Sequence, residues 1–143
     1  MISLRQYVKR RNGVPLGDNR SLPNMLRYSL GAGTFAEFWL YWNPIWGYYL
    51  ARYIQRPLLK LLPPSVALIL TFVVSGALHD LAISLVKQTV YVVFTPWFGV
   101  MALVIVLTQA LKLSYSALPW LFRAIINSVL IGASLAAVLV VSQ

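Results

Sequence analysis

The sequence predicts an all-α integral membrane protein, with about three transmembrane helices and an N-terminal re-entrant or interfacial aromatic region. Of the 143 residues, 59% are hydrophobic and only 10% are charged, whereas soluble domains carry roughly 25% charged residues. Apolar stretches long enough to cross a bilayer recur in the last two thirds of the chain. Nine of the twelve basic residues precede residue 61, which is typical of a membrane protein whose N-terminus is cytoplasmic.

Apolar residues gather in three stretches, each bounded by a charged residue or a proline. We expect transmembrane helices at residues 65–86, 89–111 and 124–141. Ahead of them, residues 24–62 are aromatic and apolar but are interrupted by charges and by Pro44. Because a proline removes a backbone donor and breaks or kinks a helix, we expect this segment to form a re-entrant, kinked or interfacial pair of helices.

The basic residues orient the chain, because Lys and Arg are retained on the cytoplasmic side. We expect residues 1–23 to form a basic cytoplasmic segment and residues 24–143 to form one helical domain, integral to the cell inner membrane. Lys87 then lies in a short outer turn, the loop before the third span lies inside, and the C-terminus lies outside. The basic cluster at residues 9–11 either contacts anionic lipid headgroups or serves only as the topology signal.

The chain has no cysteine, one histidine and three carboxylates. The absence of cysteine excludes disulfides, thiolate metal sites and a cysteine nucleophile. Asp18, Glu37 and Asp80 leave little for a metal cage or a carboxylate pair, so we expect neither a metal nor a bound cofactor. We also expect no nucleic-acid partner. Acid–base chemistry near neutral pH therefore concentrates on His79.

His79 and Asp80 interrupt the first predicted span. At about 1.5 Å of rise per residue they lie within the hydrocarbon zone, where ionisable side chains are costly and usually face protein or a water-filled cavity. Ser75 lies four residues before His79 on the same helical face, with Gly76 beside it, so another helix or a substrate chain can approach the imidazole closely. His79 suits general base catalysis on a hydroxyl. A proton relay, or simple hydrogen bonding to neighbouring helices, is the alternative role of the pair.

An aromatic cluster lies within the segment 24–62. The cluster contains six of the chain's 19 aromatic residues: Phe38, Trp39, Tyr41, Trp42, Trp46 and Tyr48. Such rings favour the headgroup level of a bilayer, so an interfacial anchor is one interpretation. Asn43 lies inside this cluster, and we expect a buried amide there that needs hydrogen-bond partners.

Two segments in this order, EFWLYWNPIWGYYLARYIQRPLL and then TFVVSGALHDLA, resemble the signature region of the membrane-bound O-acyltransferase family. The shared pattern is an aromatic F-W...W-N block, an R-Y...R-P tail and an S-G-x-x-H step in an apolar helix. The resemblance covers residues 35–86 and is greatest to the sterol and diacylglycerol acyltransferase and wax synthase branches. Those branches often have Glu where this chain has Asp80, and the chain is as short as the C-terminal half of a family member.

The resemblance implies transfer of an acyl group from a thioester, acyl-CoA or acyl carrier protein, to the hydroxyl of a lipophilic or sugar alcohol. It implies that His79 is the general base and that Asn43 orients the substrate or stabilises the oxyanion. The substrate-binding positions expected on this basis are Trp42, Ser75, Asp80, Arg52 and Arg56, with Tyr53 and Pro57 shaping the site. The two arginines could meet phosphates of a cytoplasmic donor.

Family members are much longer, so a chain with three spans would need help to enclose two substrates. A larger membrane protein partner or further copies of this chain could complete the site. Alternatively, the chain is a non-catalytic subunit that retains the fold. The third span offers a small-xxx-small pattern that permits close helix packing, formed by Gly132, Ala133, Ala136 and Ala137, with Asn127 and Ser128 as donors. It fits a docking face or internal packing. A solute or proton carrier is the weakest alternative, because no internal repeat is visible.

Overall fold

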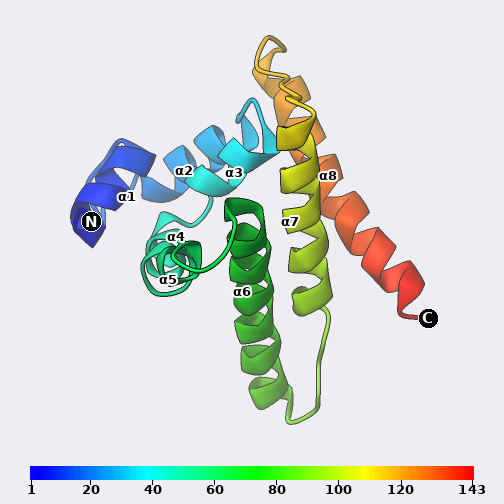
Figure 1. Cartoon of the computed structure of the whole chain (residues 1–143). Coiled ribbons are helices and arrows are strands. Elements are labelled where there is room, and N and C mark those ends of the chain that lie inside the picture. The colour runs from blue at the N-terminus through cyan, green and yellow to red at the C-terminus, as the bar shows by residue number, and fades with distance from the viewer. The chain divides into compact units, whose positions relative to one another are not determined.

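The computed structural model describes all 143 residues, and it confirms that the chain is all-α, with no strand. In chain order the helices are α1 Leu4–Asn12, α2 Ser21–Leu30, α3 Phe35–Tyr41, α4 Pro44–Leu50, the π-helical turn η1 Ala51–Gln55, α5 Arg56–Leu59, α6 Pro64–Lys87, α7 Phe94–Ala110 and α8 Trp120–Val141 (Figure 1). They build two compact units. The first unit comprises Met1–Tyr49 and Thr108–Val129, and the second comprises Leu50–Leu107 and Leu130–Gln143.

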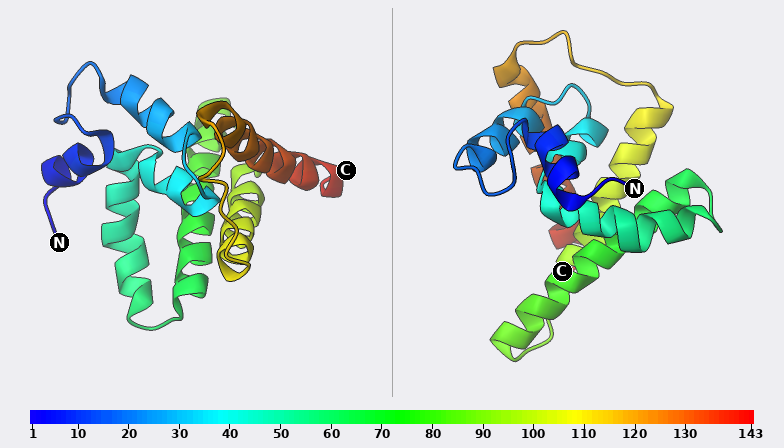
Figure 2. Two further views of the ribbon diagram at one scale, coloured as in Figure 1. Left: turned by 90° about the horizontal axis from the view of Figure 1, so that it is seen from above. Right: turned by 90° about the vertical axis from the view of Figure 1, so that its left-hand side faces the viewer.

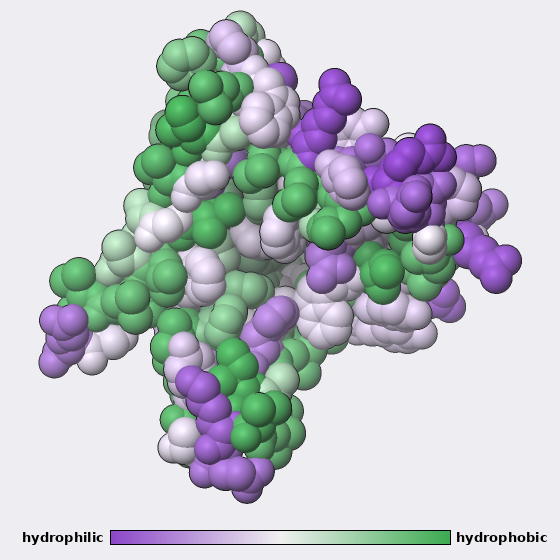
Figure 3. Space-filling view, turned by 180° about the vertical axis from the view of Figure 1, so that it is seen from behind, coloured by the Kyte–Doolittle hydropathy of each residue, from purple (hydrophilic) through white to green (hydrophobic).

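Two helices, α6 and α8, are long and apolar enough to cross a membrane, with 24 and 22 residues. Only 28% of the most apolar window of α6 is buried, and 22% of that of α8, whereas the core helix of a soluble protein is mostly buried. Apolar side chains accordingly cover much of the surface in Figure 3. The first and third predicted spans thus coincide with α6 and α8.

The third apolar helix, α7, has 17 residues and is shorter than the predicted span 89–111. Residues 89–93 are not helical, although Val90, Val92 and Val93 are as apolar as the helix that follows. Hydropathy cannot distinguish an apolar turn from an apolar helix. The helix starts at Phe94 because Asp80 of α6 accepts hydrogen bonds from the backbone N–H groups of Val93, Phe94 and Thr95.

The first unit is built on an aromatic core. Phe35 and Phe38 of α3 are almost fully buried with their ring centroids 6.1 Å apart, and Tyr7 of α1 packs against Tyr48 of α4 at 5.6 Å. The polar segment 1–23 contains α1, which the sequence had not predicted. A capping box between Ser3 and Gln6 begins this helix and Gly13, in the left-handed region, ends it.

Asn127 joins the beginning of α8 to the end of α2 in the first unit. It is fully buried, and its Nδ2 donates to the carbonyls of Leu30 and Ala32 at 2.9 and 3.0 Å. Its Oδ1 accepts a hydrogen bond from the Tyr115 hydroxyl. Asn127 is therefore used inside the chain, where it satisfies carbonyls that a helix C-terminus leaves without intrahelical donors.

The helical segment α4–η1–α5 changes its pitch just before Pro57. In η1 the backbone N–H of Arg56 donates to the Ala51 carbonyl, five residues back. Pro57 has no N–H for the Tyr53 carbonyl, and its ring would clash with that carbonyl in a regular α-helix. A wider π turn directly before the proline accommodates it. In the second unit, η1 and α5 pack on α6, and α7 returns beside α6 in both Figure 1 and Figure 2.

Candidate functional site

The imidazole of His79 is held by the backbone of its own helix. Its Nδ1 lies 2.7 Å from the carbonyl oxygen of Ser75, one turn earlier. A carbonyl oxygen only accepts hydrogen bonds, so Nδ1 carries the hydrogen, and in the neutral ring the lone pair is on Nε2. Nε2 is thus the nitrogen that can take up a proton.

Aromatic rings from α7 surround this imidazole. Phe94 stacks on it with ring centroids 5.4 Å apart and an interplanar angle of 24°, and Phe98 lies 5.2 Å away. Phe72 and Trp97 extend the cluster through their contacts with these two rings. The two phenylalanines fix the plane of the half-buried imidazole. Sequence reasoning missed both, although their spacing of four residues places them on one face of a helix that begins at residue 94.

Asp80, next in sequence, is buried and points at the start of α7. Its carboxylate accepts hydrogen bonds from the backbone N–H groups of Val93, Phe94 and Thr95 at 2.7 to 2.9 Å and from the Thr95 hydroxyl at 2.6 Å. The first N–H groups of a helix have no intrahelical partner, and a carboxylate is the favoured acceptor there. Asp80 therefore anchors α7 on α6, and these contacts favour a structural role over direct substrate binding.

Gly76 makes this anchorage sterically feasible. A Cβ atom at Gly76 would lie 2.5 Å from the carbonyl oxygen of Phe94 and 2.8 Å from the Cα of Thr95, closer than real Cβ contacts allow. Gly76 and Asp80, four residues apart, thus seat the start of α7, while Ser75 and His79, also four apart, form the imidazole contact. The close approach of another helix expected beside Ser75 is that of α7.

Asn43 is exposed rather than buried as the sequence suggested. It adopts a left-handed backbone with φ of 42°, which Asn tolerates better than most residues. Its side-chain Oδ1 accepts from the Trp46 N–H at 3.3 Å and so caps α4, in which Pro44 takes the first position. Its Nδ2 makes no hydrogen bond within the chain. The neighbouring Trp42 stacks on Phe38 at 5.6 Å.

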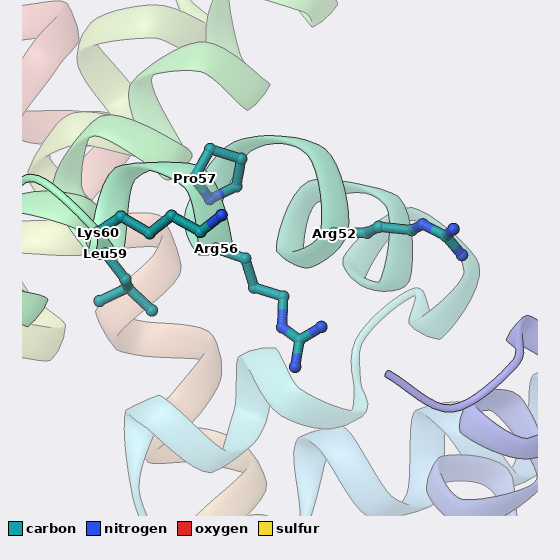
Figure 4. A pocket seen from close by; sticks show the side chains of 5 residues that line it. All are labelled: Arg52, Arg56, Pro57, Leu59 and Lys60. Carbon is teal, nitrogen blue, oxygen red and sulfur yellow. The ribbon is translucent and has the colours of Figure 1, made fainter.

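The predicted arginines lie in the second unit. Arg52 and Arg56 line an open concavity of about 510 Å³ together with Pro57, Leu59 and Lys60 (Figure 4). Arg52 also lies over the Tyr53 ring at 5.6 Å. Lys60 was not singled out from the sequence, although it continues the four-residue spacing of the two arginines.

The predicted site residues are divided between the two units. Trp42 and Asn43 belong to the first unit, and the second unit holds Arg52, Arg56, Ser75, His79 and Asp80. Within the second unit the structure brings Ser75, His79 and Asp80 together at the start of α7. Comparisons with protein-family models, curated proteins and solved structures found no match. A functional interpretation therefore depends on the residues and their geometry.

Proposed function

We propose that the chain is a membrane-embedded O-acyltransferase-like protein that moves an acyl group from a thioester to a hydroxyl, with His79 as the general base. The orientation of the imidazole supports this proposal most directly, because the Ser75 carbonyl leaves the lone pair on Nε2. In the proposed step, Nε2 takes the proton of the acceptor hydroxyl while the hydroxyl oxygen attacks the thioester carbonyl. The C–O bond of the new ester forms, the C–S bond breaks, and the thiolate leaves with the proton from His79.

In this proposal Asn43 assists by stabilising charge. The attack places negative charge on the carbonyl oxygen of the thioester, and hydrogen-bond donors aimed at that oxygen lower the barrier. The Nδ2 group of Asn43 is such a donor, since the capping contact of this residue uses only Oδ1. Because the chain has no cysteine, direct transfer to the acceptor is a simpler route than a cysteine thioester intermediate.

The proposed setting is the cell inner membrane, with the N-terminus in the cytoplasm. The length and apolarity of α6 and α8 support two crossings, and α7 would be the third. Its 17 residues correspond to about 25 Å, somewhat less than a hydrocarbon core of about 30 Å. A short helix is accommodated by local thinning of the bilayer.

The proposal is tested with membranes that contain the wild-type protein or His79→Ala at matched expression. Thiol release from long-chain acyl-CoA and from acyl carrier protein thioesters is measured in the presence of a native lipid extract, together with the esters formed. We expect both signals to fall to background in His79→Ala. Leu78→Ala, an exposed neighbour on the same helix, is the matched control and should keep them. Equal signals from the wild type and His79→Ala would exclude the base role.

A second candidate, a non-catalytic subunit of a larger membrane assembly, is favoured by one face of α8. The small residues Gly132, Ala133, Ala136 and Ala137 are all exposed, and a Cβ atom at Gly132 would meet nothing within 4 Å. The pattern therefore does not serve internal packing and leaves room for another helix. This function predicts co-purification with a partner at fixed stoichiometry, and an assembly whose activity is indifferent to His79→Ala.

A further inference from the structure

Three cations follow one another along the helical segment that leads into α6. Arg52 lies in η1, Arg56 opens α5, and Lys60 follows α5, only four residues before α6 begins at Pro64. All three are exposed and line the concavity of about 510 Å³. This surface lies directly beside the first helix that is apolar enough to cross a membrane.

The second unit offers no carboxylate side chain to neutralise Arg56 and Lys60. Asp80 is its only acidic side chain, and the Asp80 oxygens accept four hydrogen bonds at the start of α7. Arg56 and Lys60 make no ion pair within the chain. Their charges are therefore exposed to solvent and attract an anion from outside the protein.

The cations are spread along the helix rather than aimed at one point. In Figure 4, Arg56 and Leu59 both project downward, Lys60 runs toward Pro57, and Arg52 extends away from the other four labelled residues. Residues 52 to 60 span about 12 Å at a helical rise of 1.5 Å per residue. A single small anion requires convergent donors, whereas charges spread over this length match a surface of several negative groups.

Apolar side chains accompany the cations. Leu59 is 44% exposed and Leu61, between the cations and α6, is 83% exposed. Cations beside exposed apolar residues at the end of a spanning helix suit the bilayer interface, where phosphates lie above the acyl chains. We propose that Arg56 and Lys60, flanked by Arg52, bind the phosphates of anionic phospholipids where α6 enters the bilayer. This inference rests on the membrane insertion of the proposed function.

The basic residues of α1 differ in position, because the next helix along the chain, α2, is not one of the two that are long and apolar enough to cross a membrane. Lys9, Arg10 and Arg11 lie in the last turn of α1, where cations stabilise the negative end of the helix dipole. Arg5 and Lys9, both exposed, repeat the residue types, the order and the four-residue spacing of Arg56 and Lys60. They therefore provide a matched control for a change of net charge.

Native mass spectrometry of the detergent-solubilised full chain tests the proposal. It measures the affinity for added phosphatidylglycerol, which is anionic, and for phosphatidylcholine, which is zwitterionic. We expect the wild type to prefer phosphatidylglycerol, and Arg56→Gln/Lys60→Gln to weaken its binding by about tenfold or more. The control Arg5→Gln/Lys9→Gln should change it by less than about twofold. The charge-conserving Arg56→Lys/Lys60→Arg variant should retain binding and shows whether charge, rather than a folding defect, explains a loss.

Three results would overturn the inference: equal loss in the control, equal affinity for the two lipids, or full competition by inorganic phosphate, which would indicate a site for a free anion. Extraction of the wild-type membranes with alkaline carbonate distinguishes a failure of the lipid-site inference from a failure of the proposed function. If carbonate releases the wild-type chain, membrane insertion is wrong and both proposals fall. If the chain stays in the membrane but lipid binding ignores Arg56 and Lys60, only the lipid site is wrong.

Discussion

Among single residues, Asp80 has the largest structural role in our interpretation, because it holds the start of α7 on α6. Its carboxylate is the acceptor for three backbone N–H groups at the start of α7 and for the Thr95 hydroxyl. Asp80→Ala would leave these four donors without their acceptor. A fully buried donor without a partner costs about 1 to 3 kcal/mol, but Val93, Phe94 and Thr95 are only half-buried, so each donor costs less than that. We therefore expect Asp80→Ala to lower the free energy of unfolding by about 2 to 4 kcal/mol, measured by denaturation in detergent.

Thr95→Val is the graded control for this prediction. It removes only the hydroxyl donor and keeps the three backbone contacts, so we expect a loss of about 1 kcal/mol. Asp80→Asn keeps one acceptor oxygen, so its loss in the free energy of unfolding should lie between those of Thr95→Val and Asp80→Ala. If Asp80→Ala were no more costly than Thr95→Val, the carboxylate would not anchor α7.

A side chain in place of the Gly76 hydrogen should clash with the start of α7. Because a Cβ there would lie 2.5 Å from the Phe94 carbonyl oxygen, Gly76→Ala must push α7 away from α6. We expect a loss of about 1 to 3 kcal/mol in the free energy of unfolding. Gly132→Ala in α8 meets nothing within 4 Å and should be neutral or gain up to about 1 kcal/mol from helix propensity. The same loss at both glycines would contradict the role of Gly76 in seating α7.

At the element scale, Tyr115 and Asn127 hold the start of α8 to the end of α2. Burial of the hydroxyl, with a smaller contribution from the charge of Glu37, raises the pKa of Tyr115 to about 12 from its ordinary value of 10. Between these two values the unfolded chain loses the Tyr115 proton and the folded chain keeps it, so the stability that depends on this group is lost as pH rises.

Tyr115→Phe isolates this effect. The wild type should be more stable than the variant at about pH 8, because the phenylalanine lacks the hydrogen bond to Asn127, and the difference should shrink at about pH 11. The other tyrosines are common to both proteins and cancel in the comparison of unfolding free energies. A difference that stays constant over this range would show that Tyr115 ionises equally in both states.

Also at the element scale, regular helical features were predictable and long-range ones were not. The contact between Ser75 and His79 follows from the helical period, which any apolar span of this length imposes. The start of α7 depends instead on hydrogen bonds from Asp80 to backbone groups 13 to 15 residues later. A hydropathy average over neighbouring residues cannot detect such a contact. The same limit applies to Asn43, whose capping role depends on the turn before Pro44 rather than on the apolarity of its neighbours.

At the scale of the whole molecule, the apolar lengths of α6 and α8 could be predicted because hydropathy sums over about 20 residues. The division into two units could not. Its first unit joins residues near the N-terminus to the loop before α8, as when the Tyr115 N–H donates to the Gly33 carbonyl at 2.9 Å. Such contacts depend on chain reversal over some 80 positions, which local patterns do not encode.

The number of membrane crossings can be tested by cysteine labelling, because the chain has no cysteine of its own. Single cysteines at the exposed positions Asn19, Thr89, Ser114 and Gln143 report the side of the membrane through a membrane-impermeant thiol reagent applied to intact cells. If α6, α7 and α8 all cross, Thr89 and Gln143 should react, whereas Asn19 and Ser114 should react only after the membrane is opened.

The pair Thr89 and Ser114 is decisive because these residues flank α7. A helix of 17 residues is near the lower limit for a transmembrane helix, so an alternative in which α7 lies at the interface predicts the same reactivity at both ends. In that case Gln143, beyond α8, would be on the side of the N-terminus. Opposite reactivity of Thr89 and Ser114 would therefore establish three crossings. Equal reactivity would establish two, and the imidazole of His79 and the start of α7 would then lie at a different depth of the bilayer than they do with three crossings.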